Sequence, residues 1–163
     1  MSYRIVTVSD RPELAPIIAR WRVDAFFNHP GGYTVEEMTA RILAPPVGAK
    51  QAFVLLDDDE PAGTAALTHS DLATRPDLTP WLAGVFVQPA FRGRGYATAL
   101  VRRVEAFAWE ASVPVLWLHT EMAEPLYAGL GWRRVGIEQD HGHPVVLMRR
   151  SLSEEAVAPG HAK

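Results

Sequence analysis

The spacing of apolar residues divides the first part of the chain into a strand and two helices. Residues 3–8 alternate polar and apolar positions, as a half-buried strand does. Residues 14–27 carry apolar side chains close to helical spacing. Thr34 followed by Glu37 forms a capping box, which predicts a second helix that ends near Leu43.

The middle of the chain predicts a hairpin, a further strand and the clearest helix. Apolar runs at residues 51–56 and 63–68 flank the polar segment 57–61, so we expect an antiparallel hairpin. We assign the acidic side chains of that segment no role beyond the turn. Residues 81–87 form another apolar strand, and residues 96–111 place apolar side chains at three- and four-residue steps.

The last part of the chain predicts one strand, a short helix and a final strand pair. These elements are expected at residues 113–118, 124–130, 133–138 and 145–150. The whole order indicates a mixed α/β sheet with one strand–helix–strand crossover at its centre. We expect residues 1–152 to form a single domain and the polar residues 153–163 to form a flexible tail.

Composition narrows the class of protein. The chain has 163 residues, of which 48% are hydrophobic and 21% charged, as in an ordinary globular domain. It has no cysteine, which excludes thiolate nucleophiles and is typical of a reducing compartment. The net charge of −3 argues against a nucleic-acid partner, and the absence of long uncharged apolar runs argues against a membrane partner. We therefore expect a cytoplasmic protein.

A glycine-rich turn between a strand and the clearest helix is the strongest chemical signal. Arg92, Gly93, Arg94 and Gly95 precede the helix, whose first amide N–H groups have no partner within it. Such a terminus suits an anion, and glycine allows a phosphate to approach the backbone. The sequence has no Gly-Lys-Ser/Thr run, and Thr98 stands where a dinucleotide fingerprint needs its third glycine. A purely structural turn is the alternative.

Two motifs resemble those of a known superfamily. Val87-Gln-Pro89 followed by Arg92-Gly-Arg-Gly-Tyr-Ala97 resembles the acetyl-CoA-binding signature Q/R-x-x-G-x-G/A of the GCN5-related N-acetyltransferase (GNAT) superfamily. Tyr127, four residues ahead of the pair Gly131-Trp132, resembles its second signature. The resemblance covers about residues 3–150 and is strongest over 82–132. It implies the acyl-CoA N-acyltransferase fold, an α/β fold with a mixed, mostly antiparallel sheet of about six to seven strands and one splayed strand pair.

The resemblance also implies an activity and a set of site residues. Acetyl-CoA would serve as co-substrate, and its acetyl group would pass directly to a primary amine, in the first instance that of a small molecule. The coenzyme would contact strand, turn and helix residues Val85, Phe86, Val87, Arg92, Gly93, Arg94, Gly95, Tyr96, Ala97 and Thr98, and also Thr120 and Tyr127. Tyr127 would protonate the departing thiolate, or only hydrogen-bond the sulfur.

The chain departs from the superfamily pattern at two places. The strand at residues 81–87 has no carboxylate or histidine to serve as base, and Thr120 stands where relatives often have asparagine. Glu121 is the candidate that could attract a cationic amine and remove its proton. Structural roles are equally compatible with Glu121, Glu124 and His119. No histidine spacing or carboxylate triad supports a metal site.

The acceptor is the least determined part of the site. Asp71 and Asp77 would give a loop at residues 70–80 a negative charge suited to a cationic amine, although loop aspartates are often only turn residues. The missing base leaves open a non-catalytic CoA-sensing or interaction module, and an acetyltransferase of protein or peptide N-termini is a third possibility. Exposed aromatic residues could support a homodimer.

Overall fold

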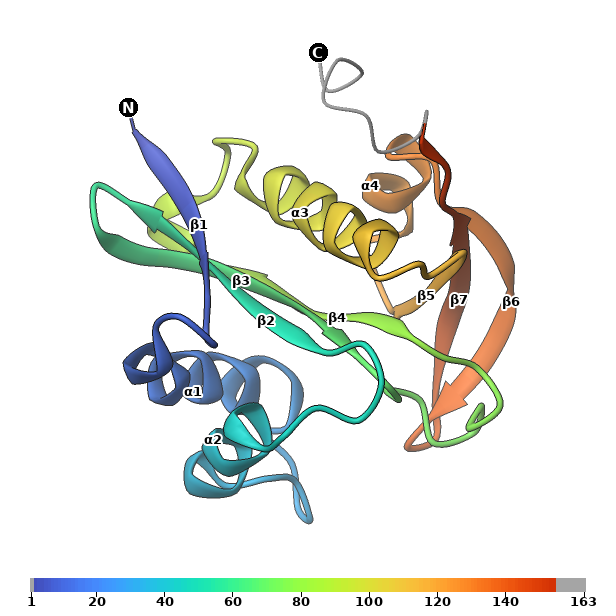
Figure 1. The fold of residues 1–163 in the computed structure, drawn as a ribbon. Coiled ribbons are helices and arrows are strands. Elements are labelled where there is room, and N and C mark those ends of the chain that lie inside the picture. The colour runs from blue at the N-terminus through green and yellow to red at the C-terminus, as the bar shows by residue number, and fades with distance from the viewer. Residues whose placement is uncertain (1, 155–163) are drawn as a thin grey trace.

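The computed structural model describes residues 2–154, so the tail expected at residues 153–163 lies outside the described residues from 155 on. Its sheet has seven strands in the order β1-β2-β3-β4-β5-β7-β6. Helices α1 and α2 cover one face, and α3 and α4 lie on the other (Figure 1). The elements are β1 (Tyr3–Thr7), a 3-10 turn (Pro12–Leu14), α1 (Ala15–Phe26), α2 (Val35–Leu43), β2 (Gln51–Asp57), β3 (Glu60–Thr68), β4 (Trp81–Val87), a 3-10 turn (Pro89–Phe91), α3 (Tyr96–Glu110), β5 (Val115–Thr120), α4 (Glu124–Gly129), β6 (Arg133–Asp140) and β7 (His143–Ser151).

The strand pairing confirms the predicted fold class. Every neighbouring pair is antiparallel except β4 and β5, which are parallel. The crossover through α3 requires that exception, because parallel neighbours cannot be joined by a tight turn. The sequence pattern did not predict that β7 lies between β5 and β6.

Two hairpins are tighter than the sequence pattern suggested. Asp58 and Asp59 both have positive φ, 48° and 71°, as the two central residues of a type I′ turn do. Strand β3 therefore begins at Glu60 and not at residue 63. His141 and Gly142 form a similar turn, with φ of 51° and 82°, so β6 continues to residue 140.

The sheet separates two hydrophobic cores. Leu100, Val101 and Val104 of α3 pack on one face, and Ile18 of α1 and Met38 of α2 pack on the other. Their apolar spacing predicts both burials. This arrangement holds α3 and α1 on opposite faces of the sheet, and both helices contact β4 (Figure 1).

Strands β4 and β5 pair at one position only, Trp81 with Trp117. Beyond it, residues 82–87 of β4 have no partner on β5, and we call this loss of pairing the β4–β5 divergence. It confirms the expected splayed strand pair. The part of β4 without a partner on β5 contains a bulge, because Gly84 and Val85 together oppose the single residue Ala65 of β3. Gly84 has φ of 63°, a backbone conformation that favours glycine.

Candidate functional site

The turn between β4 and α3 is exposed and ends in a left-handed glycine. Gly93 and Gly95 have φ of 83° and 79°, and a Cβ added to either would meet open space. The first helical hydrogen bond runs from the Ala99 N–H to the Gly95 carbonyl oxygen at 3.1 Å. Within residues 2–154, the N–H groups of Gly93, Gly95, Ala97 and Thr98 have no hydrogen-bond acceptor. The turn thus presents several donors to an anion.

The two arginines of the turn are held by the protein. Arg92 Nε donates a hydrogen bond of 2.9 Å to the Val87 carbonyl oxygen, and its guanidinium lies 5.8 Å from the centre of the Phe86 ring. Arg94 Nη1 lies 2.7 Å from Asp57 Oδ2 in an ion pair. Both cations therefore help to shape the turn while they add positive charge beside it.

Asp57 corrects the expectation that the acidic segment has no role. Its carboxylate is buried, with 6% of the residue exposed. Oδ2 also accepts a hydrogen bond of 2.6 Å from the Tyr96 hydroxyl, which explains why Tyr96 is buried at the first position of α3. The end of β2 thus anchors the residues on either side of Gly95. Only the tertiary pairing of β2 and β3 distinguishes Asp57 from the exposed Asp58 and Asp59.

Tyr127 lies on α4 and is buried, with 7% exposed. Burial raises the pKa of Tyr127 to about 12. Its ring makes an edge contact with Trp132 at 6.2 Å, and its carbonyl oxygen accepts a hydrogen bond of 3.0 Å from the Trp132 N–H. The second motif is therefore a compact turn that fixes the tyrosine, and the hydroxyl stays protonated at neutral pH.

Glu105 and its partners hold this second motif against α3. The carboxylate is 1% exposed and accepts a hydrogen bond of 3.0 Å from Trp132 Nε1. Arg102 Nη1 lies 2.9 Å from its other oxygen and also donates to the Leu130 carbonyl oxygen. Arg150 Nε lies 3.3 Å from Glu105 as a second counter-charge. The apolar spacing of residues 96–111 gives no sign that this charged residue of α3 is buried.

The other predicted residues near the end of β5 divide into two groups. Thr120 Oγ1 accepts a hydrogen bond of 3.0 Å from the Ala123 N–H, and Glu124 makes two hydrogen bonds of 2.8 Å with Arg134. The Arg134 hydrogen bonds lower the pKa of Glu124. Both residues thus contribute to local structure. Glu121 is exposed and makes no hydrogen bond or ion pair within residues 2–154.

His119 forms an ion pair that the sequence did not reveal. Its Nε2 atom lies 2.9 Å from Asp71 Oδ2, and its ring lies 6.0 Å from Trp81, where the β4–β5 divergence begins. Burial alone would lower the pKa of His119, but the hydrogen bond and charge of Asp71, with the charge of Asp140, raise it above its ordinary value. His119 is therefore an oriented titratable group beside the divergence.

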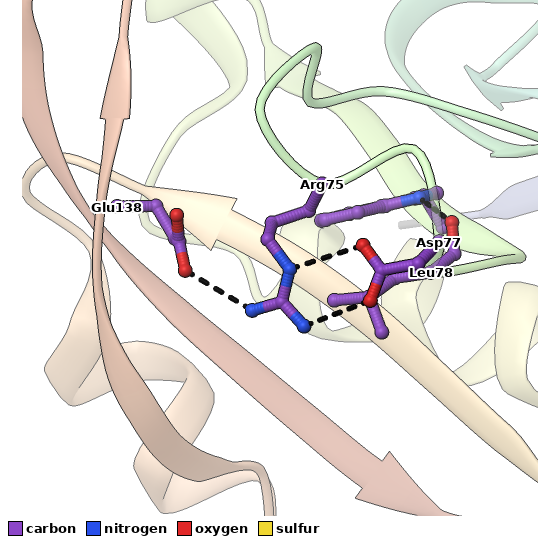
Figure 2. A network of polar contacts seen from close by, with 5 residues as sticks. Arg75, Asp77, Leu78 and Glu138 are labelled. Carbon is purple, nitrogen blue, oxygen red and sulfur yellow. Dashed lines mark hydrogen bonds and ion pairs between the residues drawn. The ribbon is translucent and has the colours of Figure 1, made fainter.

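The loop before β4 is fastened to β6. Figure 2 shows the Arg75 guanidinium between two carboxylates: Nη1 lies 3.0 Å from Glu138 Oε2, and Nη2 lies 3.0 Å from Asp77 Oδ2. Trp81 Nε1 donates a hydrogen bond of 2.8 Å to the Leu78 carbonyl oxygen in the same network. Asp71 and Asp77, the expected attractors of a cationic amine, thus already have partners in His119 and Arg75.

Comparison with known proteins identifies the family. The model of the acetyltransferase (GNAT) family matches residues 16–132, which is most of the chain. The chain belongs to the GNAT family. This confirms the resemblance drawn from the two motifs. No curated protein matched the sequence.

Solved structures support the same fold. An aminoglycoside 6′-N-acetyltransferase complexed with coenzyme A has a TM-score of 0.73 at 15% identity, covering 93% of this chain and 97% of that one. The protein yncA from Salmonella typhimurium, solved with acetyl-CoA, has a TM-score of 0.74 at 16% identity, covering 100% and 98%. An N-acetyltransferase from Staphylococcus aureus Mu50 has 0.72 at 14%, covering 94% and 100%.

In residues 2–154, no group of three or more metal-ligating side chains is close enough to hold an ion. No helix in that part of the chain is long and apolar enough to cross a membrane.

Proposed function

We propose that this GNAT-family protein is an N-acetyltransferase that transfers the acetyl group of acetyl-CoA directly to the primary amine of a small molecule. The observation that carries the proposal is the set of unpartnered amides at Gly93, Gly95, Ala97 and Thr98, placed beside the β4–β5 divergence. Family membership and the coenzyme named in two similar structures support the choice of acetyl-CoA.

The residues present fit the phosphates of coenzyme A. A diphosphate carries charge on two neighbouring groups, which suits successive backbone donors at a helix N-terminus. The space that an added Cβ would fill at Gly93 or Gly95 is available to its oxygens. Arg92 and Arg94 add positive charge next to the turn. We expect Tyr96, Ala97 and Thr98 to form the fixed first turn of α3 and to contribute backbone N–H donors.

The pantetheine arm would extend the sheet along β4. Residues 82–87 lack a partner on β5, so an extended chain can lie there as an added strand. The bulge at Gly84 and Val85 changes the direction of the backbone groups just before Phe86 and Val87. We place the thioester carbonyl near the N–H groups of Phe86 and Val87, where one donor aimed at a developing oxyanion contributes roughly 3 kcal/mol.

In the reaction, the amine nitrogen forms a bond to the thioester carbon, the C–S bond breaks, and the electron pair leaves with the sulfur. Tyr127 is the proposed donor to that sulfur. Its pKa of about 12 lies above the ordinary thiol value of about 8.5, so complete proton transfer to the thiolate is unfavourable. We therefore assign Tyr127 a hydrogen bond that stabilises the leaving thiolate, with proton transfer late or from solvent.

The proton lost by the amine needs an acceptor. The sequence indicates Glu121 as a candidate, but this residue is exposed and no hydrogen bond or ion pair within residues 2–154 orients it. His119 is better supported, because its Nε2 atom contacts the Asp71 carboxylate and its ring lies beside the β4–β5 divergence. We infer that His119 is the general base, with Glu121 as the rival, and that it acts above its raised pKa, where the ring is neutral.

A thermal-shift titration with acetyl-CoA, CoA and ATP tests the coenzyme site. At a hundredfold excess over Kd, binding should add about 2.7 kcal/mol, or roughly 5 to 10 °C in Tm. Gly95→Glu should abolish the shift, because its carboxylate would occupy the phosphate position. Gly136→Glu is the matched control, since a Cβ at Gly136 also meets open space on the distant strand β6.

Turnover is measured as CoA release with amino acids, polyamines, aminoglycosides and peptides as acceptors. Release with a small amine supports the proposal. A larger shift with ATP than with acetyl-CoA contradicts it. Tight acetyl-CoA binding without release on any amine would instead favour a CoA-sensing module, and release with peptides alone would favour N-terminal acetylation.

A further inference from the structure

Arg22 of α1 is a buried cation that has no partner within residues 2–154. The residue is 9% exposed, and its Nε and Nη2 atoms are buried without a hydrogen-bond acceptor. Within residues 2–154 it makes no hydrogen bond or ion pair at all. An unpaired buried charge is costly, and natural proteins usually pair it. This arrangement therefore suggests that the counter-ion of Arg22 comes from a ligand.

Arg22 lies on the part of β4 that is proposed to hold the thioester. A Cβ added to Gly84, in the β4 bulge, would lie 3.0 Å from Arg22 Nε. The preceding residue, Trp21, packs on Phe86 with ring centres 5.6 Å apart. The guanidinium is thus held over the bulge by a helix that is itself packed on β4. Nη1 is not among its buried nitrogens, so a ligand would approach from that side.

The charges around Arg22 leave a deficit of negative charge. Burial lowers the pKa of Arg22 to about 10, so it is still a cation at neutral pH; the charge of Asp71 raises the pKa and that of Arg41 lowers it. Burial lowers the pKa of Lys50, as does the nearby charge of Arg22, and within residues 2–154 Lys50 donates only to the carbonyl oxygens of Arg41 and Ala44. Asp71, the carboxylate whose charge raises the pKa of Arg22, is already in contact with His119.

We propose that Arg22 binds the carboxylate of the acceptor, so that the substrate is an amine that also carries a carboxylate, of the α-amino acid class. The inference rests on the proposed acetyl transfer. A guanidinium matches a carboxylate with two parallel hydrogen bonds. One carboxylate would balance the buried charge of Arg22, and Asp71, whose charge also acts on Arg22, would attract the ammonium of such a zwitterion before it loses its proton.

The proposed acceptor carries a negative group in addition to the cationic amine that the loop residues alone indicate. Asp71 and Asp77 indicated a cationic amine from the sequence, but Asp77 is paired with Arg75, Asp71 contacts His119, and the buried charge without a partner in residues 2–154 is the cation Arg22. A polycation would also be repelled by Arg22. The structure therefore favours zwitterionic acceptors over polyamines and aminoglycosides.

Matched acceptor pairs test the proposal. Each α-amino acid is compared with its α-carboxamide, which has the same amine and side chain but no negative charge. We expect kcat/KM to be at least about tenfold higher for the acid. Arg22→Gln should reduce kcat/KM for the acid by about 10- to 100-fold and leave kcat/KM for the amide within about twofold of its original value. Arg22→Lys keeps the charge but cannot make the two parallel hydrogen bonds of a guanidinium. Its ratio of kcat/KM for the acid to that for the amide should therefore be intermediate. Arg20 is an exposed neighbour on α1, so Arg20→Gln should change kcat/KM for neither the acid nor the amide.

A binding measurement separates this inference from the acetyl transfer. Isothermal titration of the coenzyme-free protein with N-acetyl amino acids and their amides should show binding of the acids alone, lost in Arg22→Gln. Equal acetylation of acids and amides, with Arg22→Gln lowering both alike, would overturn the carboxylate assignment and leave the acetyltransferase standing. If no acceptor is acetylated, the proposed acetyl transfer is wrong. In that case, selective binding of the N-acetyl acids still supports the Arg22 site, whereas a failure of these acids to bind overturns it.

Discussion

The His119 Nε2 atom lies 2.9 Å from Asp71 Oδ2 and joins the end of β5 to the loop that precedes β4. Asp71 raises the pKa of His119 against the opposing effect of burial. Because the folded pKa lies above the unfolded value of about 6.5, the pair stabilises the fold fully below that pH and less as pH rises through the folded pKa. Asp71→Asn should therefore lower the free energy of unfolding more at pH 5.5 than at pH 9, by about 1 kcal/mol.

Urea denaturation at the two pH values checks this prediction, and NMR titration of the His119 ring locates the pKa. Asp24→Asn, at an exposed position of α1, is the control and should show no such pH dependence. If His119 is the base, kcat/KM rises with pH through its pKa, and Asp71→Asn moves the midpoint to lower pH. An unchanged midpoint would return the role to Glu121.

Glu105 should be one of the most sensitive positions for stability. Its removal leaves Arg150, which is 12% exposed, without its buried counter-charge and Trp132 Nε1 without its hydrogen-bond acceptor. Glu105→Ala should cost about 3 kcal/mol in the free energy of unfolding. Glu110→Ala, on an exposed position of the same helix, should cost under about 0.5 kcal/mol. Similar urea midpoints for the two variants would contradict the buried network.

Asp57 should couple stability to coenzyme binding. Asp57→Asn weakens the acceptor of both Arg94 Nη1 and the Tyr96 hydroxyl, so we expect a loss of about 2 kcal/mol. Because these bonds hold the residues on either side of Gly95, the Kd for CoA should also rise, by roughly tenfold. Asp58→Asn is the control: it lies in a type I′ turn that accepts asparagine, and both quantities should stay unchanged. Calorimetric titration with CoA measures the difference.

The sequence pattern predicted most of the fold because local signals agree with it. The Thr34 capping box forms as expected, with Thr34 Oγ1 accepting from the Glu37 N–H at 3.1 Å. The apolar periodicity of α3 predicts its buried face. The two GNAT motifs flank the crossover, and their spacing places Tyr127 on the short helix after β5.

The sequence could not predict which charged residues are buried. Glu105 and Asp57 read as surface residues, because only the docking of Trp132 and the pairing of β2 with β3 enclose them. Arg22 lies at a position of α1 whose neighbours are apolar, and nothing local shows that its partner is missing. Such pairings depend on residues far apart in the chain, so periodicity carries no signal for them.

Tyr127 should affect turnover without a large effect on folding. Tyr127→Phe keeps the ring contact with Trp132 and removes only the hydroxyl proposed to stabilise the thiolate, so kcat should fall about a hundredfold while the Kd for acetyl-CoA changes little. Since burial raises the pKa of Tyr127 to about 12, the hydroxyl should stay protonated and the rate should not decline between pH 8 and about pH 10 through this residue. Stopped-flow detection of CoA release measures both effects. An unaffected Tyr127→Phe rate would remove the tyrosine from the reaction and leave it the packing role that its contact with Trp132 already supports.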